Sequence, residues 1–210
     1  GSILQKLGVK QVDGIVADLG LSRELLEDAN RGFSFLTDGP LDMRVDPELP
    51  LTAADIVNHY GEKPLAELLW RFGEERRAQR IARAIVRARP LAGTRRLADV
   101  IEGAAPRTKR GGIHPATRTF QALRIVVNDE LGELGKLLET APPLLAPGGR
   151  LVILSFHSLE DRAVKQALRS WAERKVLRIL TKHVIRPGIE EVRRNPASRS
   201  ARLRAAERVG

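Results

Sequence analysis

Two apolar runs, far apart in the chain, have the pattern of buried β-strands. Residues 13–20 (DGIVADLG) place consecutive apolar side chains between turn-forming residues, and residues 150–156 (RLVILSF) do the same after an APGG turn. Uninterrupted apolar runs of this length are typical of parallel strands that are buried on both faces. Open α/β sheets bind ligands at the carboxyl ends of such strands. The pattern predicts an α/β fold, with Asp18 and His157 at the ligand-binding edge.

Between the two runs, apolar residues recur at helical spacing in four short segments. These are residues 51–60, 63–72, 74–88 and 94–104, and Thr52 is the expected N-cap of the first. A single crossover between parallel strands needs far fewer residues than lie here. We therefore predict an all-helical subdomain at residues 47–114, inserted into an α/β core that consists of residues 1–46 and 115–210.

The stretch HPATRTFQALRIVVNDEL (114–131) begins a helix that is predicted to run to about Leu138 and to lead into the second strand. One face of it is apolar, and the other carries hydrogen-bonding side chains instead of the Glu and Lys that are common on solvated helices: Arg118, Gln121, Arg124 and Asn128. These residues either line a cleft for a polar ligand or bind the carbonyl groups of a neighbouring loop. After the second strand, the pattern predicts a helix at 159–171 and two final strands, at 176–184 and 202–209.

Basic residues are concentrated in two tracts. Residues 71–124 hold 14 Lys and Arg against 4 Asp and Glu, and residues 169–208 hold 12 against 4, in a chain of net charge +10. Tracts of this density are typical of proteins that contact phosphate groups, although solvated helix faces give the same composition. Within 74–88 the arginines lie away from the apolar face.

Composition narrows the function classes. The chain has no cysteine, and no apolar run approaches the roughly 18 residues that a membrane span needs, so we expect a cytoplasmic protein without a membrane partner. Phosphate-binding P-loops and dinucleotide fingerprints are absent from the sequence. Although Asp18, His157 and Asp161 all lie near strand ends, they lack metal-ligand spacing, and no metal is expected.

The segment RGFSFLTDGPLDMRVD (31–46) has the composition of an ordered functional loop. Phe33 and Phe35 either stack on a nucleobase or anchor the loop to the core. Asp42 and Arg44 either orient a polar ligand or pair with each other. For Asp18 the alternatives are accepting hydrogen bonds from amino groups and capping the next helix, for which Ser22 is better placed. His157 is either a proton or hydrogen-bond acceptor or a structural histidine.

Together these stretches resemble one family, the bacterial small-subunit ribosomal RNA cytosine-N4 methyltransferases of the RsmH (MraW) type. The resemblance rests on DGIVADLGLS, RGFSFLTDGPLDMRVD, GEERRAQRIARAIV, HPATRTFQALRIVVNDEL, LLAPGGRLVILSFHSLEDRAVK and NPASRSARLRAAER, in the family's order. It implies a class I (Rossmann-like) fold that uses S-adenosyl-L-methionine. Members of the family begin with a further stretch that holds most of the cofactor cradle, and Leu25 stands where they have a glutamine. The resemblance therefore implies an N-terminally incomplete form with impaired cofactor binding.

The resemblance also implies roles for residues. Asp18 would contact the cofactor and the target amine, and His157 or Asp42 would be a second acceptor. Phe33 and Phe35 would hold a base turned out of its stack. Phosphates of the RNA, naked or in a ribosomal particle, would lie along the basic residues Arg44, Arg76, Arg80, Arg83 and Arg118. The alternatives are a non-catalytic RNA-binding or ribosome-assembly module, and a chain that forms a homodimer through an exposed edge of the 13–18 strand.

Overall fold

The computed structural model describes residues 2–106 and 113–210. The chain divides into two compact units. We call residues 1–20 and 131–210 the sheet unit and residues 21–130 the helical unit. In the described residues, no helix is long and apolar enough to cross a membrane.

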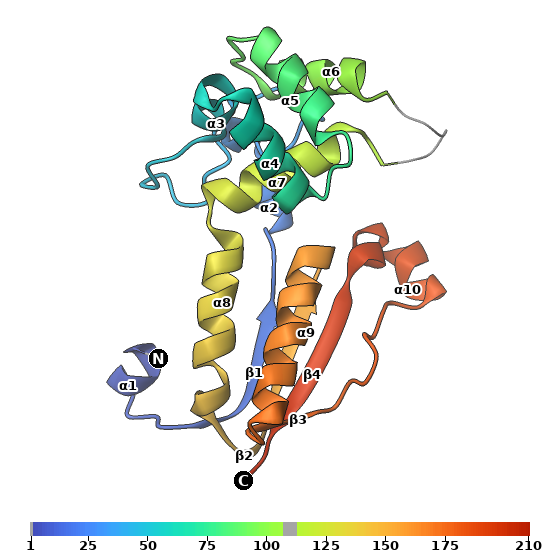
Figure 1. Cartoon of the computed structure of the whole chain (residues 1–210). Helices are drawn as coiled ribbons and strands as arrows, with labels where there is room; N and C mark the ends of the chain where they lie inside the picture. Colours follow the sequence, from blue (N-terminus) through green and yellow to red (C-terminus); the bar gives the residue numbers. More distant parts are fainter. Residues whose placement is uncertain (1, 107–112) are drawn as a thin grey trace. The chain divides into compact units, whose positions relative to one another are not determined.

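The sheet unit contains four strands in the order β1–β2–β4–β3 (Figure 1). β1 (Val12–Asp18) pairs in parallel with β2 (Leu145–Ser155), and Asp18 lies beside Leu154 in the register. β4 (Arg202–Arg208) pairs antiparallel with both β2 and β3 (Leu177–Ile179). The prediction of an α/β sheet whose last two strands come from the C-terminal segments is confirmed.

One face of the sheet packs against two helices. Leu134 and Leu138 of α8 (Glu130–Thr140) and Val164 and Leu168 of α9 (Ser158–Glu173) share a core with alternate residues of β2, among them Leu151. Trp171 of α9 donates from Nε1 to the carbonyl of Leu138 (2.9 Å), which ties the two helices together. The remaining elements of the unit are α1 (Ser2–Lys6), η2 (Pro142–Leu144), α10 (Ile189–Arg194) and η3 (Pro196–Ser200).

The prediction that the first strand is buried on both faces is wrong for the described structure. β1 is an edge strand, and the side chain of Val16 is 72% exposed. Ile15 and Ala17 point into the core, whereas Val16 and Asp18 lie on the opposite face. No helix among the described residues covers that opposite face, so the apolar run of β1 is only half buried.

The helical unit contains short helices that surround one core. Ser22 caps α2 (Arg23–Glu27) through a bond from the Leu25 N–H, and Thr52 forms a capping box with Asp55 at α3 (Ala53–His59). Both caps agree with the sequence prediction. The other elements of the unit are η1 (Ala29–Arg31), α4 (Glu62–Gly73), α5 (Ala78–Arg87), α6 (Thr94–Ala104) and α7 (Ala116–Val127).

The predicted helix from 115 to about 138 is two helices. α7 ends at Val127 and α8 begins at Glu130, and between them Asp129 has a φ of 46°, outside the helical region. Asn128 is the C-cap, and its side chain binds a loop distant in the sequence. The helical periodicity continues across the break, which is why the pattern alone predicts one helix.

The helical unit is larger than the predicted insertion at 47–114. Phe33, Leu41 and Met43 from the loop and Phe120 and Leu123 from α7 are buried in the same core as the inserted helices. The loop and α7 therefore pack with the helices, whereas the predicted boundaries assigned them to the α/β core.

Candidate functional site

The residues predicted to act together divide between the two units. Asp18 and His157 belong to the sheet unit. The others belong to the helical unit: Phe33, Phe35, Asp42, Arg44, Arg76, Arg80, Arg83 and Arg118. Each group is therefore described within its own unit.

Asp18 is the last residue of β1, and its side chain is exposed. Its carboxylate has no hydrogen bond or ion pair with any residue that the structure describes. The cap of α2 is Ser22 and not Asp18, so the capping alternative for Asp18 is not the observed one. The carboxylate is thus free to accept hydrogen bonds at the carboxyl end of a strand, where α/β sheets bind ligands.

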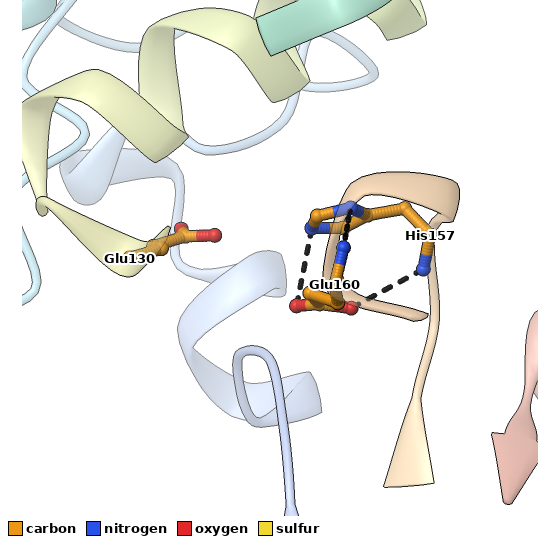
Figure 2. Close-up of side chains that lie close together, drawn as sticks. All are labelled: Glu130, His157 and Glu160. Atoms are coloured by element: carbon orange, nitrogen blue, oxygen red, sulfur yellow. Dashed lines mark hydrogen bonds and ion pairs between the residues drawn. The ribbon is translucent and has the colours of Figure 1, made fainter. Parts of the chain in front are cut away.

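His157 is held at the junction of β2 and α9 by a reciprocal bond with Glu160 (Figure 2). The Glu160 backbone N–H donates to Nδ1 of His157 (3.3 Å), and Nε2 lies 3.1 Å from Oε1 of Glu160. Nδ1 is therefore used in a hydrogen bond, and Nε2 lies in a short contact with the Glu160 carboxylate without a well-aligned hydrogen bond. This geometry supports the structural alternative for His157.

Glu160 is the more constrained member of this pair. Its Oε2 accepts from the backbone N–H groups of Phe156 (2.8 Å) and His157 (3.2 Å), and its side chain is buried. Burial alone would raise the pKa of Glu160, but the bond and charge of His157 and the two N–H donors outweigh it and lower the pKa. The carboxylate therefore stays ionised and holds the end of β2 to the start of α9.

In the loop of the helical unit, Asp42 and Arg44 pair with each other. Arg44 donates from Nε and Nη2 to the two carboxylate oxygens of Asp42 (2.8 and 2.9 Å). This side-chain bond holds the pKa of Asp42 below its usual value. Arg44 also donates from Nη1 to the carbonyls of Pro47 (2.6 Å) and Leu49 (2.9 Å). The pair closes the loop, and both carboxylate oxygens of Asp42 are already in use.

Asn128, at the end of the polar face of α7, binds the backbone of a neighbouring loop. Its Nδ2 donates to the carbonyl of Met43 (2.7 Å), and its Oδ1 accepts from the Val45 N–H (2.7 Å). Met43 is fully buried with a φ of 61°, a conformation that L-residues rarely adopt. Asn128 therefore braces a strained turn, which is the loop-binding role predicted as one alternative.

Two other members of that face, Arg118 and Arg124, also have partners inside the helical unit. Arg124 forms an ion pair with Glu130 (2.7 Å), and Arg118 donates to the carbonyl of Glu74 (3.2 Å). The side chain of Arg118 is nevertheless exposed, so only part of its hydrogen-bonding capacity is engaged.

The two phenylalanines of the loop are anchored in the helical core. Phe33 is 7% exposed, and Phe35 packs its ring against His114 (4.5 Å between centroids) and edge-on against Phe120 (5.0 Å). A nucleobase could stack on Phe33 only if the ring left the core. The geometry thus supports anchoring, the second of the two alternatives.

Arg80, Arg83 and Arg87 of α5 and Arg76 in the turn before it are exposed. Arg83 lies 3.2 Å from Glu62, but Arg76 and Arg80 have no ion pair within residues 2–106 and 113–210. The face opposite them is buried, as the spacing predicts: Ala78, Ile81, Ala82 and Ile85. Two exposed guanidinium groups without ion pairs among the described residues, one on α5 and one just before it, are able to contact phosphates.

Sequence reasoning missed Glu160 and Arg31. Arg31 donates from Nη2 to the carbonyls of Arg44 (2.8 Å) and Val45 (2.5 Å), across the loop. Glu160 stands three residues after His157 at a helix start, and a cap followed by Glu at that spacing is the pattern of a capping box. No local signal marks Arg31, because its partners are backbone carbonyls more than ten residues away.

Comparisons with known proteins agree on one family. The sequence model of the MraW methylase family matches residues 1–209. The chain is 58% identical over 204 residues to the ribosomal RNA small subunit methyltransferase H of Solibacter usitatus, covering 97% of this chain and 71% of that protein. It is 58% identical over 197 residues to the protein of the same name from Acidobacterium capsulatum, covering 94% of this chain and 66% of that protein. It is 55% identical over 203 residues to the protein of the same name from Synechococcus elongatus, covering 96% of this chain and 68% of that protein.

Proposed function

The chain belongs to the MraW methylase family, and we propose that it transfers a methyl group from S-adenosyl-L-methionine to N4 of a cytosine in small-subunit ribosomal RNA. The relatives that carry the name of a ribosomal RNA small subunit methyltransferase support this assignment. Because ribosomal RNA is the substrate, the proposal locates the protein in the cytoplasm.

The single observation that carries the proposal is the free carboxylate of Asp18 at the carboxyl end of β1. Of the three predicted catalytic residues, Asp18 alone has no partner in the described part of the chain, since Asp42 is paired with Arg44 and His157 with Glu160. S-adenosyl-L-methionine carries amino and hydroxyl groups, and a free carboxylate can accept hydrogen bonds from them. Asp18 therefore fits the cofactor. Leu25 offers the cofactor no polar group, because its side chain is a hydrocarbon, and this side chain packs against the helical core.

When bound, S-adenosyl-L-methionine supplies an activated methyl group. The chain must then make the cytosine amine more nucleophilic, because the lone pair of this amine is delocalised into the ring. An acceptor that holds an N–H bond of this amine makes the nitrogen a better nucleophile, and Asp is suited to read the amine edge of cytosine. We assign this role to Asp18. A second acceptor, His157 or Asp42, would first have to exchange the hydrogen bonds that it makes now.

The exposed arginines of the helical unit would position the RNA. Arg76, Arg80, Arg83 and Arg118 all offer guanidinium nitrogens at the surface, and contacts of this kind are independent of base sequence. A non-catalytic RNA-binding module is the second candidate, favoured by Leu25 and by the anchored, non-stacking position of Phe33.

The test is methyl transfer to small-subunit ribosomal RNA, with the modified nucleoside identified by mass spectrometry. We expect Asp18→Ala to lower the rate by at least about 100-fold, because an acceptor for the reacting amine is lost. The matched control is Asp13→Ala, which removes a carboxylate from the other end of the same strand. Equal rates for the two variants would remove Asp18 from the mechanism. RNA binding without measurable affinity for the methyl donor would favour the second candidate.

A homodimer through the edge of β1 is a further part of the proposal. In the described residues, β1 pairs only with β2, and Val16 next to the free edge is exposed. Sedimentation should show a dimer fraction that rises with concentration and is lost in Val16→Lys. The corresponding change Leu36→Lys, at an exposed apolar residue of the helical unit, should leave it unchanged. A monomer at all concentrations would contradict the dimer.

A further inference from the structure

A small hollow lies in the sheet unit between α9 and the ends of β3 and β4. Its lining comes from three chain segments: Lys165, Leu168 and Arg169 of α9, Ile179, Thr181 and Lys182 at and after β3, and Arg204 of β4. All of these residues belong to one compact unit, so the hollow does not depend on how the two units are placed.

The floor of the hollow is rigid. Arg204 is 9% exposed and donates from Nε and Nη2 to the two carboxylate oxygens of Asp161 (2.6 and 3.2 Å). Thr181 is 8% exposed, and its Oγ1 accepts from the Ala205 N–H (3.0 Å). Leu168 is part of the core. The polar groups at the bottom of the hollow are therefore held by hydrogen bonds to α9 and β4.

The rim, in contrast, consists of cations without partners. Lys165 and Arg169 stand one helical turn apart on α9, and Lys182 follows β3. All three side chains are exposed, and none has an ion pair or hydrogen bond within the part of the chain that the structure describes. By comparison, Arg178 of β3 is paired with Glu207 of β4 (2.6 Å). Three positive charges around one hollow together attract an anion.

The geometry points to a binding site for backbone phosphates of RNA in this hollow, separate from the arginine surface of the helical unit. A phosphodiester carries one negative charge and has oxygens that accept from both Lys and Arg. The apolar lining residues Leu168 and Ile179 reduce the screening of the charges by water. The site rests on the proposed function in that RNA is its ligand. It would hold the substrate without reading its bases.

The experiment measures affinity for a small-subunit ribosomal RNA fragment over a series of salt concentrations. The variant is Lys165→Gln, Arg169→Gln and Lys182→Gln together. The matched control removes three other exposed cations of the same unit, as Lys6→Gln, Lys10→Gln and Lys175→Gln. We expect the first variant to bind at least about tenfold more weakly at low salt, with a salt slope that is smaller by about 2 to 3. Because all three side chains are exposed, thermal unfolding should be unchanged.

The outcomes separate this site from the proposed activity. Equal affinity and equal salt slope for the two variants would overturn the site, even if both transfer methyl groups. Selective loss of RNA affinity in the first variant, in a protein that transfers no methyl group, would support the site and overturn the activity. Failure of the unaltered protein to bind RNA would overturn both. Binding of inorganic phosphate in the hollow with no effect on RNA affinity would also overturn the site as an RNA contact.

Discussion

Replacing Gly32 by alanine is expected to destabilise the helical unit by about 3–5 kcal/mol, among the largest effects of a single methyl group. A Cβ at Gly32 would lie 1.8 Å from the carbonyl oxygen of Pro40, and the φ of +68° is unfavourable for any L-residue. The obstacle is backbone, which cannot move aside as a flexible side chain would. Gly39→Ala should behave in the same way, because its Cβ would lie 1.9 Å from the carbonyl oxygen of Ala29.

These two glycines allow the backbone of residues 29–32 to approach the backbone of residues 39–42 closely. The second of these segments leads into the buried Met43 and contains Asp42, the partner of Arg44. Hydrogen exchange followed by mass spectrometry should therefore show loss of protection in the loop and in α7 before the sheet unit is affected. Gly103→Ala is the control. It lies in α6 with open space around the new methyl group, and it should be neutral or stabilising by about 0.5–1 kcal/mol. Unchanged protection in Gly32→Ala would contradict the close approach.

Replacing Glu160 by alanine is expected to cost the sheet unit about 2–4 kcal/mol at neutral pH, since two partly buried N–H groups lose their acceptor. These are the backbone donors of Phe156 and His157, which join β2 to α9. Urea unfolding followed by the fluorescence of Trp171 on α9 measures the effect, because Trp171 is the tryptophan of the sheet unit. The control is Glu173→Ala, an exposed carboxylate on the same helix, with an expected change within about 0.5 kcal/mol.

The contribution of the Glu160 carboxylate to the free energy of unfolding should decrease in acid. Its folded pKa is lowered below the ordinary value of 4.5, so the ionised carboxylate contributes stability above that pH. The contribution is lost as the pH falls through the folded pKa. The difference in unfolding free energy between the unaltered protein and Glu160→Gln should therefore be constant near neutrality and shrink in acid. A difference that stays the same down to acid unfolding would contradict the assigned role of the carboxylate.

The predictions that succeeded depend on neighbours in the chain. Ser22 and Thr52 bind N–H groups three residues ahead, and the apolar face of α5 follows from the spacing of its own residues. The Asp42–Arg44 pair is equally local, which is why mutual pairing was one of the two alternatives. The family resemblance was also visible in these stretches, and the match over residues 1–209 confirms it.

The predictions that failed depend on contacts with segments that are distant in the chain. The break after α7 is set by Asn128, whose partner Met43 is 85 residues away in the chain. The exposure of Val16 depends on which elements cover the second face of the sheet, and an apolar run carries no information about its neighbours.

The sequence by itself determined the family, the α/β class, the helix starts and the basic surface, because periodicity, caps and charge are properties of residues a few positions apart. Only the tertiary structure decided which candidate side chains remain free. It engaged His157, Asp42 and Phe33 in internal contacts and left Asp18, Arg76 and Arg80 without partners in the described residues. Buried polar groups must find partners wherever the fold brings them, and those partners are set by packing between distant segments.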